Sequence, residues 1–497
     1  MKKINGFLFK KEAISPWIGL LISSLSVLLI QVLVDFQPFD DAYITYRYAR
    51  NLSHGLGFVY NQGEKVLGTT TPLFTLLLAA IGYLTRPAYI PLASYALSVI
   101  ADIISVWLIF RLTDSIFKSK WIAILSSAVF LLQPFRLNVA SGGMETSLFI
   151  TSLLLTYYSY LVKKRSYSTA IWAGLAALIR PDAVLALLPV YGDWLFKDWR
   201  TCLKAGLLTL LVVSPWLIWS TAYFGLPIPH SLLAKSITYK NPPGHAAFFL
   251  LTFLGTGTQG PYSSPWVLLP ILLFGVPVLT LGMIVLSRQK SSGWILGAYP
   301  ALYTLVMALI NPAMIFSWYF LPLIPGMVVL TMGLIWFGAK LERKTRLLLL
   351  SVISLFLILV PGVLLHQSPS SLVSRTREAS FWEACEQIVD HELVGKTVLA
   401  PDIGVIGWCL EEARILDPIG LVSPESLPYA EDLPPGQLVS LALIRDKEPD
   451  YIITLDHFLT PEILEGVEFP KPYHLLYQEA LMIAGDTHFI YVFQLEN

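Results

Sequence analysis

Two adjacent carboxylates, Asp40 and Asp41, follow the first long apolar segment of the chain. A carboxylate at the edge of a membrane is costly unless it is paired or has a function. Neighbouring acids that are partly desolvated also tend to raise the pKa of one of the two, which favours acceptance of a proton from a hydroxyl group. Both are therefore candidate catalytic bases, and the sequence leaves open which one acts. In the structural alternative, one caps the following helix and the other pairs with an arginine.

Three cations are candidates to bind an anion, such as a phosphate, beside these acids. In a helix that follows the acids, Arg47 is two turns from Asp40 on the same face. Arg180 and Asp182 lie two residues apart in an otherwise apolar stretch, and Lys235 lies in a long loop. Charged residues in such stretches usually face a cavity. Alternatively, Asp182 simply neutralises Arg180.

Other polar side chains are candidates for contacts with a substrate. Glu145 begins an apolar helix, where the helix dipole alone would favour an acid. His230 could assist a proton transfer, although a single histidine in a loop is more often structural. Tyr319 could stack on a substrate ring, although aromatic residues at such positions also serve as membrane anchors. Asp182 and Tyr46 complete this set of predicted substrate contacts.

The composition indicates an integral membrane protein. The 497 residues are 55% hydrophobic and only 14% charged, with a mean hydropathy of +0.63; soluble domains carry about 25% charged residues. The net charge of zero hides an asymmetry, because residues 1–365 contain 27 Lys and Arg against 12 Asp and Glu, and residues 366–497 contain 7 against 22. We therefore predict a transmembrane domain, 1–365, and a water-exposed domain, 366–497. No motif indicates nucleic-acid binding.

Eleven apolar segments are predicted to cross the bilayer, although two of them, 168–179 and 181–196, are shorter than the roughly 20 residues of a full span. A twelfth, 72–85, is predicted to lie at the interface without crossing. The eleven are 17–34, 90–110, 121–138, 146–162, 168–179, 181–196, 203–223, 264–286, 294–311, 317–338 and 347–365.

This count places every basic link on one side. Because cytoplasmic loops collect Lys and Arg, the links at 111–120, 163–165, 197–204, 288–290 and 340–346 are predicted to be cytoplasmic, together with the lysine-rich N-terminus. The Asp40 loop, the turn at Glu145, the Arg180 turn, the loop 224–262 and the C-terminal domain then lie outside.

Residues 366–497 are predicted to form a small α/β domain. Short strands are expected at Lys396–Pro401, Tyr451–Leu455 and Phe489–Leu495, and a helix at 378–392. The apolar residues of that helix repeat with a helical period. The sequence of this region shows no recognisable metal-ligand spacing.

The polar motifs resemble those of the GT-C superfamily of polyprenyl-phosphate-sugar-dependent glycosyltransferases. They are similar to the branch of terminal arabinofuranosyltransferase-like proteins and more distantly to ArnT-like and protein mannosyltransferase-like enzymes. The resemblance rests on the segments 40–51, 57–64, 143–146, 180–182 and 319–322, the loop at Lys235, and the turns at 402–404 and 417–421.

The resemblance implies an all-α polytopic GT-C-like domain of about 11 helices with a small extracytoplasmic α/β domain, in the plasma membrane. It implies an inverting transfer from a polyprenyl-phosphate-linked sugar to a glycan, lipid or protein acceptor, with an acid of the first loop as base. Relatives differ in their need for a divalent metal, so metal dependence stays open. The rival functions are a transporter or flippase of lipid-linked sugars and a non-catalytic assembly protein.

Overall fold

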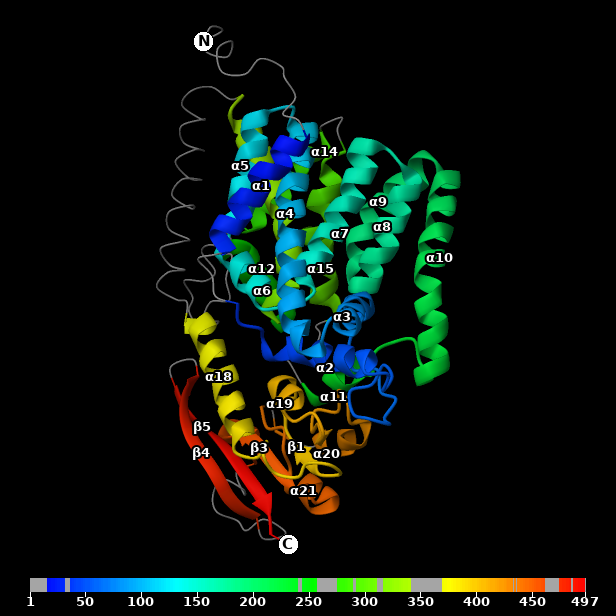
Figure 1. Ribbon diagram of the computed structural model, residues 1–497. Helices are drawn as coiled ribbons and strands as arrows, with labels where there is room; N and C mark the ends of the chain where they lie inside the picture. Colours follow the sequence, from blue (N-terminus) through cyan, green and yellow to red (C-terminus); the bar gives the residue numbers. More distant parts are fainter. Residues whose placement is uncertain are drawn as a thin grey trace.

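A computed structural model describes residues 16–31, 36–239, 244–256, 275–288, 292–310, 316–340, 369–431, 433–434, 436–460, 473–483 and 486–496. The chain forms a bundle of helices with a smaller α/β part at one end (Figure 1). Three short helices lie where the two parts meet: α2 (Asp40–Ser53), α3 (Pro72–Leu84) and α11 (His230–Thr238).

Twelve further helices build the bundle within the described residues. Three helical stretches there are long and apolar enough to cross a membrane: Pro87–Phe117, Trp199–Phe224 and Leu321–Gly338. The predicted eleven crossings are therefore not established individually. The bundle helices are α1 (Pro16–Gln31), α4 (Ile90–Phe117), α5 (Lys120–Leu131), α6 (Pro134–Ser141), α7 (Thr146–Tyr158), α8 (Ser166–Ile179), α9 (Ala183–Lys197), α10 (Trp199–Phe224), α12 (His245–Thr256), α14 (Val276–Ser287), α15 (Trp294–Ile310) and α16 (Ile324–Gly338).

Two predicted segments differ in the structure. The expected span 121–138 is divided into α5 and α6, because Pro134 cannot continue a helix from the preceding turn and instead starts α6. The Gln133 side chain accepts a hydrogen bond from the Arg136 amide at 2.6 Å and caps the new helix. The expected outer loop 224–262 contains α11 and α12. The predicted span 347–365 lies outside the described residues.

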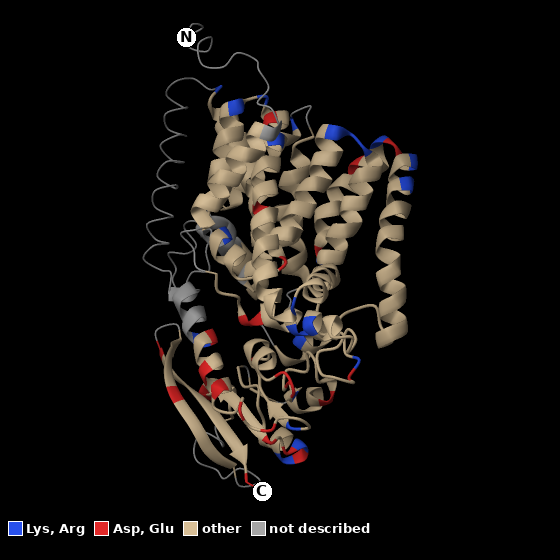
Figure 2. Cartoon of the chain, viewed as in Figure 1, with Lys and Arg blue, Asp and Glu red and all other residues tan. Residues whose placement is uncertain are grey.

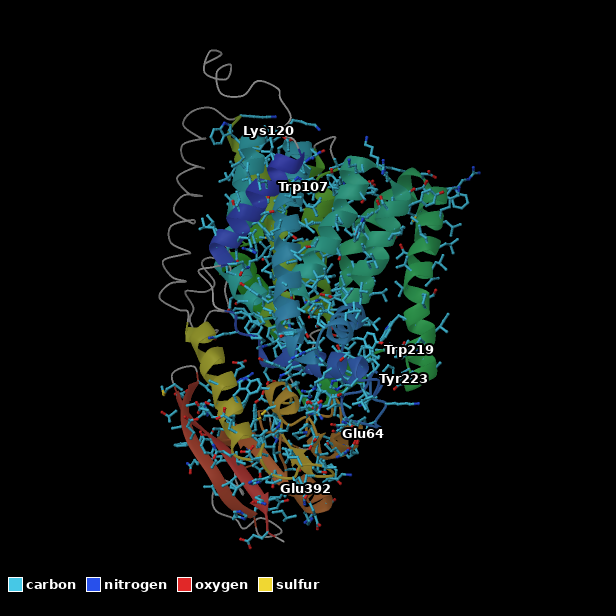
Figure 3. All side chains as sticks on the ribbon, in the orientation of Figure 1. Glu64, Trp107, Lys120, Trp219, Tyr223 and Glu392 are labelled. Carbon is cyan, nitrogen blue, oxygen red and sulfur yellow. The ribbon has the colours of Figure 1, made fainter. Side chains whose placement is uncertain are left out.

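The basic links gather at the end of the bundle that is remote from the α/β part. The links between α4 and α5, α7 and α8, and α9 and α10 all lie at this end (Figures 1 and 2). Figure 3 shows Lys120 there, whereas Glu64 and Trp219 lie towards the α/β part. Trp219 stacks on Tyr223 with a centroid distance of 4.9 Å at the end of α10; such aromatic groups are typical of a membrane interface.

The C-terminal part contains a five-stranded sheet in the order β2-β1-β3-β5-β4. Strands β1 (Thr397–Leu399) and β3 (Tyr451–Leu455) lie within the predicted strands, and β5 (Asp486–Leu495) includes the third. Strands β2 (Arg414–Leu416) and β4 (Tyr473–Ile483) were not predicted, because β2 has only three residues and β4 is largely exposed without a regular alternation of buried and exposed side chains.

The helices of this part also differ from the prediction in their bounds. Helix α18 spans Pro369–Glu386 and ends before the predicted residue 392. The remaining helices are α19 (Gly404–Cys409), α20 (Leu427–Ala430) and α21 (Leu441–Lys447).

Helix α2 packs directly against α19, and this contact joins the two parts. A side chain at Gly404 would place its Cβ 1.8 Å from the Asp40 carbonyl oxygen, and one at Gly407 would place it 1.8 Å from the Tyr60 hydroxyl. At Gly404 only glycine permits the two backbones to approach so closely, and at Gly407 only glycine leaves room for the Tyr60 hydroxyl. Residues of both parts, such as Tyr46 and Val405, belong to one buried apolar cluster. The junction is therefore a packed core.

Candidate active site

Asp40 is almost completely buried and caps a helix of the C-terminal part. Its two carboxylate oxygens accept hydrogen bonds from the backbone amides of Gly404 at 3.0 Å and Val405 at 2.7 Å, at the start of α19. Only 3% of the residue is exposed. Burial raises the pKa of Asp40 to about 8, and the nearby Asp402 carboxylate adds to the rise. Asp40 therefore caps α19. The structural alternative predicted from the sequence was that one of the two acids caps the helix that follows them, which is α2.

Asp41 has a different environment. Its side chain is partly exposed and forms no hydrogen bond with any residue that the structure describes. Its electrostatic neighbours are Lys235, Arg377 and Asp402. Burial raises the pKa of the Asp41 carboxyl, and the cations Lys235 and Arg377 oppose the rise. Of the two acids, Asp41 is therefore the one whose oxygens remain available for a substrate hydroxyl.

Arg47 lies on α2 with Asp40, seven residues further along. Its guanidinium donates hydrogen bonds to backbone carbonyl oxygens. It donates to the carbonyl oxygens of Tyr60 at 2.9 Å, Leu410 at 3.3 Å and Ala413 at 2.8 Å, and closely to that of Gly407. The residue is 1% exposed. Cations near the carbonyl end of a helix are favoured by its dipole. Asp40 and Arg47 therefore hold the two ends of α19.

Arg180 forms an ion pair with each of two predicted substrate contacts. Its Nε and Nη2 atoms donate to the two oxygens of Asp182 at 2.9 Å each, and Nη1 donates to Glu145 at 3.4 Å. The guanidinium also lies 5.0 Å from the centre of the Tyr319 ring. A bidentate pair of this kind is strong and geometrically specific. The alternative in which Asp182 neutralises Arg180 is the arrangement present here.

Lys235 brings a positive charge to Asp41 from α11. Its Nζ atom lies 4.8 Å from the centre of the Phe316 ring. Burial lowers the pKa of Lys235, but the Tyr319 hydroxyl and the Asp41 carboxylate outweigh this effect, so the net shift is upward. Lys235 is therefore held in its charged form beside Asp41.

The two other predicted substrate contacts, Tyr46 and His230, lie around the acid pair and bond to the protein itself. Tyr46 is fully buried, donates its hydroxyl to the carbonyl oxygen of Gly143 at 2.7 Å and also bonds to Ser94. The His230 amide donates to the Leu67 carbonyl oxygen at 2.8 Å. The Nε2 atom of His230 is buried without a hydrogen-bond partner among the described residues.

Two charged residues of the C-terminal part join the site and were not predicted. Arg377 on α18 lies 3.7 Å from Asp402, which follows β1. The buried Nε atom of Arg377 has no hydrogen-bond partner within the described part of the chain, so a donor remains available close to Asp41. The Asp402-x-Gly404 turn can be recognised in the sequence. A single arginine in a helix, such as Arg377, has no sequence pattern that would mark it as a site residue.

A pocket opens next to this cluster, between the segment before α2, helix α6 and helix α18. Its walls carry aromatic rings and hydrogen-bonding groups, the combination that is found in sites for polar organic ligands. They include Phe36, Phe39, Tyr43, Trp382, Asn138 and Glu378. Glu378 also accepts a hydrogen bond from the Asp40 amide at 3.2 Å, which connects the pocket to the acid pair.

Comparison with known proteins identifies relatives of both parts. Residues 70–219 match the family model of dolichyl-phosphate-mannose-protein mannosyltransferases, and residues 375–491 match a domain of unknown function. A terminal β-(1→2)-arabinofuranosyltransferase of Mycobacterium tuberculosis is 26% identical over 215 residues, which are 39% of this chain and 34% of that protein. Over part of its length, the chain is therefore similar to glycosyltransferases.

Further comparisons find a second curated protein and a solved structure that are similar to this chain. A Corynebacterium glutamicum protein of the same name is 27% identical over 230 residues, 40% of this chain and 33% of that protein. The chain thus spans about a third of the length of these curated relatives. The crystal structure of ArnT from Cupriavidus metallidurans bound to undecaprenyl phosphate matches with a TM-score of 0.56 at 13% identity, over 96% of this chain and 98% of that one. This likeness shows that the chain has an ArnT-like fold.

Proposed function

We propose that this protein is an integral membrane glycosyltransferase that transfers a sugar from a polyprenyl-phosphate donor to an acceptor of the cell envelope. The acceptor is a glycan, a lipid or a protein. One observation carries the proposal: Asp41, a carboxylate without a hydrogen bond to any described residue, lies beside the cations Lys235 and Arg377 at the junction of the two parts. Its GT-C relatives support the assignment.

The reaction follows from these charges. Asp41 removes the proton of the acceptor hydroxyl as its oxygen attacks the anomeric carbon, and the bond from that carbon to the phosphate oxygen breaks. The electron pair leaves with the lipid phosphate, and the anomeric configuration inverts because attack and departure occur on opposite faces. Lys235 and Arg377 stabilise the charge of the departing phosphate. Arg47 and Arg180, which were predicted as phosphate ligands, instead position α19 and the Glu145–Asp182 pair in this proposal.

The proposal includes the membrane arrangement. The bundle, residues 1–365, crosses the plasma membrane eleven times with its N-terminus in the cytoplasm, and residues 366–497 form the extracytoplasmic domain. The gathering of basic links at the remote end supports this orientation, because such links stay cytoplasmic. The active site then faces the outer surface.

The direct test is transfer by the purified, full-length protein from synthetic polyprenyl-phosphate sugars to a panel of envelope acceptors. We expect a glycosylated product whose new linkage has the inverted anomeric configuration by NMR. Absence of transfer from every donor, together with movement of the same lipids across proteoliposomes, would favour the flippase instead.

Replacing Lys235 is expected to weaken donor binding. Lys235→Gln removes the charge beside the phosphate, and a charge-assisted hydrogen bond contributes roughly 1.5–3 kcal/mol, so the donor KM should rise by about ten- to a hundredfold. Lys235→Arg should retain much of the affinity. Steady-state kinetics at varied donor concentration measure both.

Lys65→Gln is the matched control for this prediction. Lys65 is exposed on the same side of the bundle and lies over the ring of Tyr223 at 4.7 Å, away from the acid pair. An equal rise in the donor KM for Lys65→Gln and Lys235→Gln would show a general surface effect and contradict the assigned role of Lys235.

A further inference from the structure

Three side chains of metal-ligand type meet at one edge of the sheet, away from the acid pair. Strand β3 ends at Leu455 and is followed by the short 3-10 helix η8 (Asp456–Phe458). Strand β5 runs antiparallel to β3, and Leu455 pairs with Ile490. The residues after Leu455 therefore lie beside the residues before Ile490. This pairing brings Asp456 and His457 next to His488.

The ring nitrogens of both histidines face the same carboxylate oxygen. The Asp456 Oδ1 atom lies 2.8 Å from Nδ1 of His488 and 3.4 Å from Nδ1 of His457. One ligand atom from each residue can be chosen so that all three lie within 4.8 Å of one another. The side chains are 20%, 36% and 23% exposed for Asp456, His457 and His488, so solvent reaches the cluster.

A hydrogen-bonded pair of Asp456 and His488 explains only part of this arrangement. A single imidazole N–H satisfies that pair at 2.8 Å. The second imidazole, of His457, points its Nδ1 atom at the same oxygen at 3.4 Å, beyond a good hydrogen bond. The same oxygen also accepts the backbone amide of His457 at 2.7 Å, which fixes its position between the two rings. The three side chains therefore already stand within reach of one ion.

We propose that Asp456, His457 and His488 bind a divalent transition-metal ion of the zinc class. Two imidazole nitrogens and one carboxylate oxygen, with a further position open to solvent, form a common ligand set for zinc. Magnesium and calcium instead prefer sites made of oxygen ligands. Ligand atoms around a tetrahedral zinc, with bonds of about 2.0–2.1 Å, are roughly 3.3 Å apart. The spacing from Asp456 to His457 already agrees, and that from Asp456 to His488 needs to open by about 0.5 Å.

The ion would add a link between the end of β3 and the start of β5, beyond the last pair of their ladder, Leu455 with Ile490. His457 also lies within electrostatic range of Asp402, which belongs to the acid cluster. The site is separate from the proposed transfer reaction, and its test needs no donor or acceptor. Failure of the glycosyltransferase proposal would therefore leave the metal proposal standing, and the reverse also holds.

Metal content of the untagged full-length protein tests the proposal. After treatment with EDTA, incubation with zinc chloride and gel filtration, mass spectrometry should find about one zinc per chain. Cobalt chloride in place of zinc should produce visible absorption bands of a four- or five-coordinate ion. His457→Ala and His488→Ala should each lower the retained zinc to near zero.

His474→Ala is the matched control, because His474 is exposed on β4 and pairs with Gln494 at the opposite end of the same hairpin. It should retain about one zinc. A parent protein that retains far less than one zinc per chain would overturn the proposal without reliance on any variant. Equal zinc in the parent, His457→Ala and His488→Ala would overturn it as well.

Discussion

Asp41→Asn is expected to lower the turnover of glycosyl transfer by about 10²–10⁴-fold, the usual contribution of a general base. The amide has nearly the same shape as the carboxylate but cannot accept the proton of the acceptor hydroxyl. The substitution removes no hydrogen bond to a described residue, so the thermal midpoint should change little. Turnover at saturating donor and acceptor, with the thermal midpoint measured in parallel, checks both expectations.

The pH profile of the parent enzyme provides a second measurement of the same prediction. A base must be deprotonated to act, and burial raises the pKa of Asp41 above its ordinary value. Turnover should therefore fall as the pH decreases, with an inflection above the usual range of aspartate, and Asp41→Asn should lose this inflection. If Asp41→Asn keeps parental turnover while Asp40→Asn loses it and stays folded, Asp40 is the base.

Arg47→Met is expected to loosen the attachment of the C-terminal domain to α2. The substitution removes the guanidinium donor from the carbonyl oxygens of Gly407, Leu410, Ala413 and Tyr60. Three of these oxygens keep a second donor, from Arg50, from the Ala413 amide and from Asn51 respectively for Gly407, Leu410 and Tyr60, so among the described residues only the Ala413 oxygen loses its partner. A buried acceptor without a partner costs about 1–3 kcal/mol, and we expect a loss of stability of that size. The thermal midpoint and the rate of limited proteolysis at residues 400–416 measure this loss.

Arg86→Met is the control for this effect, because Arg86 is exposed before the short helix that starts at Pro87. We expect it to match the parent protein. If Arg47→Met also leaves the proteolysis rate and the thermal midpoint unchanged, α19 is held in place by its apolar contacts alone. The inference that Arg47 holds α19 against α2 would then be wrong.

The contact between α2 and α19 explains why the two neighbouring acids have different surroundings. Asp40 stands at the amide end of α19 and Arg47 at its carbonyl end, where the helix dipole favours a negative and a positive charge respectively. With Asp40 committed to two amides, Asp41 is left at the adjacent position facing Lys235 and Arg377. Asp40 thus places the C-terminal part, and in the proposed function Asp41 faces the substrate.

The amino-acid sequence alone determined the features that depend on composition and local pattern. Long apolar segments indicate a membrane protein, and the distribution of Lys and Arg anticipates the end of the bundle at which the basic links lie. The acid pair was located by its position after an apolar segment. The placement of Asp40 and Arg47 two turns apart assumed a helix after the acids, and α2 is that helix.

Only the tertiary structure decided which side chains meet. Asp40 finds its partner 364 residues away at Gly404, and Arg377 approaches Asp41 from a separate helix. His457 and His488 come together because β3 and β5 pair. Such contacts depend on how distant segments pack, and side chains reach only a few ångströms. No local periodicity of the chain encodes them, so the different surroundings of Asp40, Asp41 and Arg47 could be seen only in the folded protein.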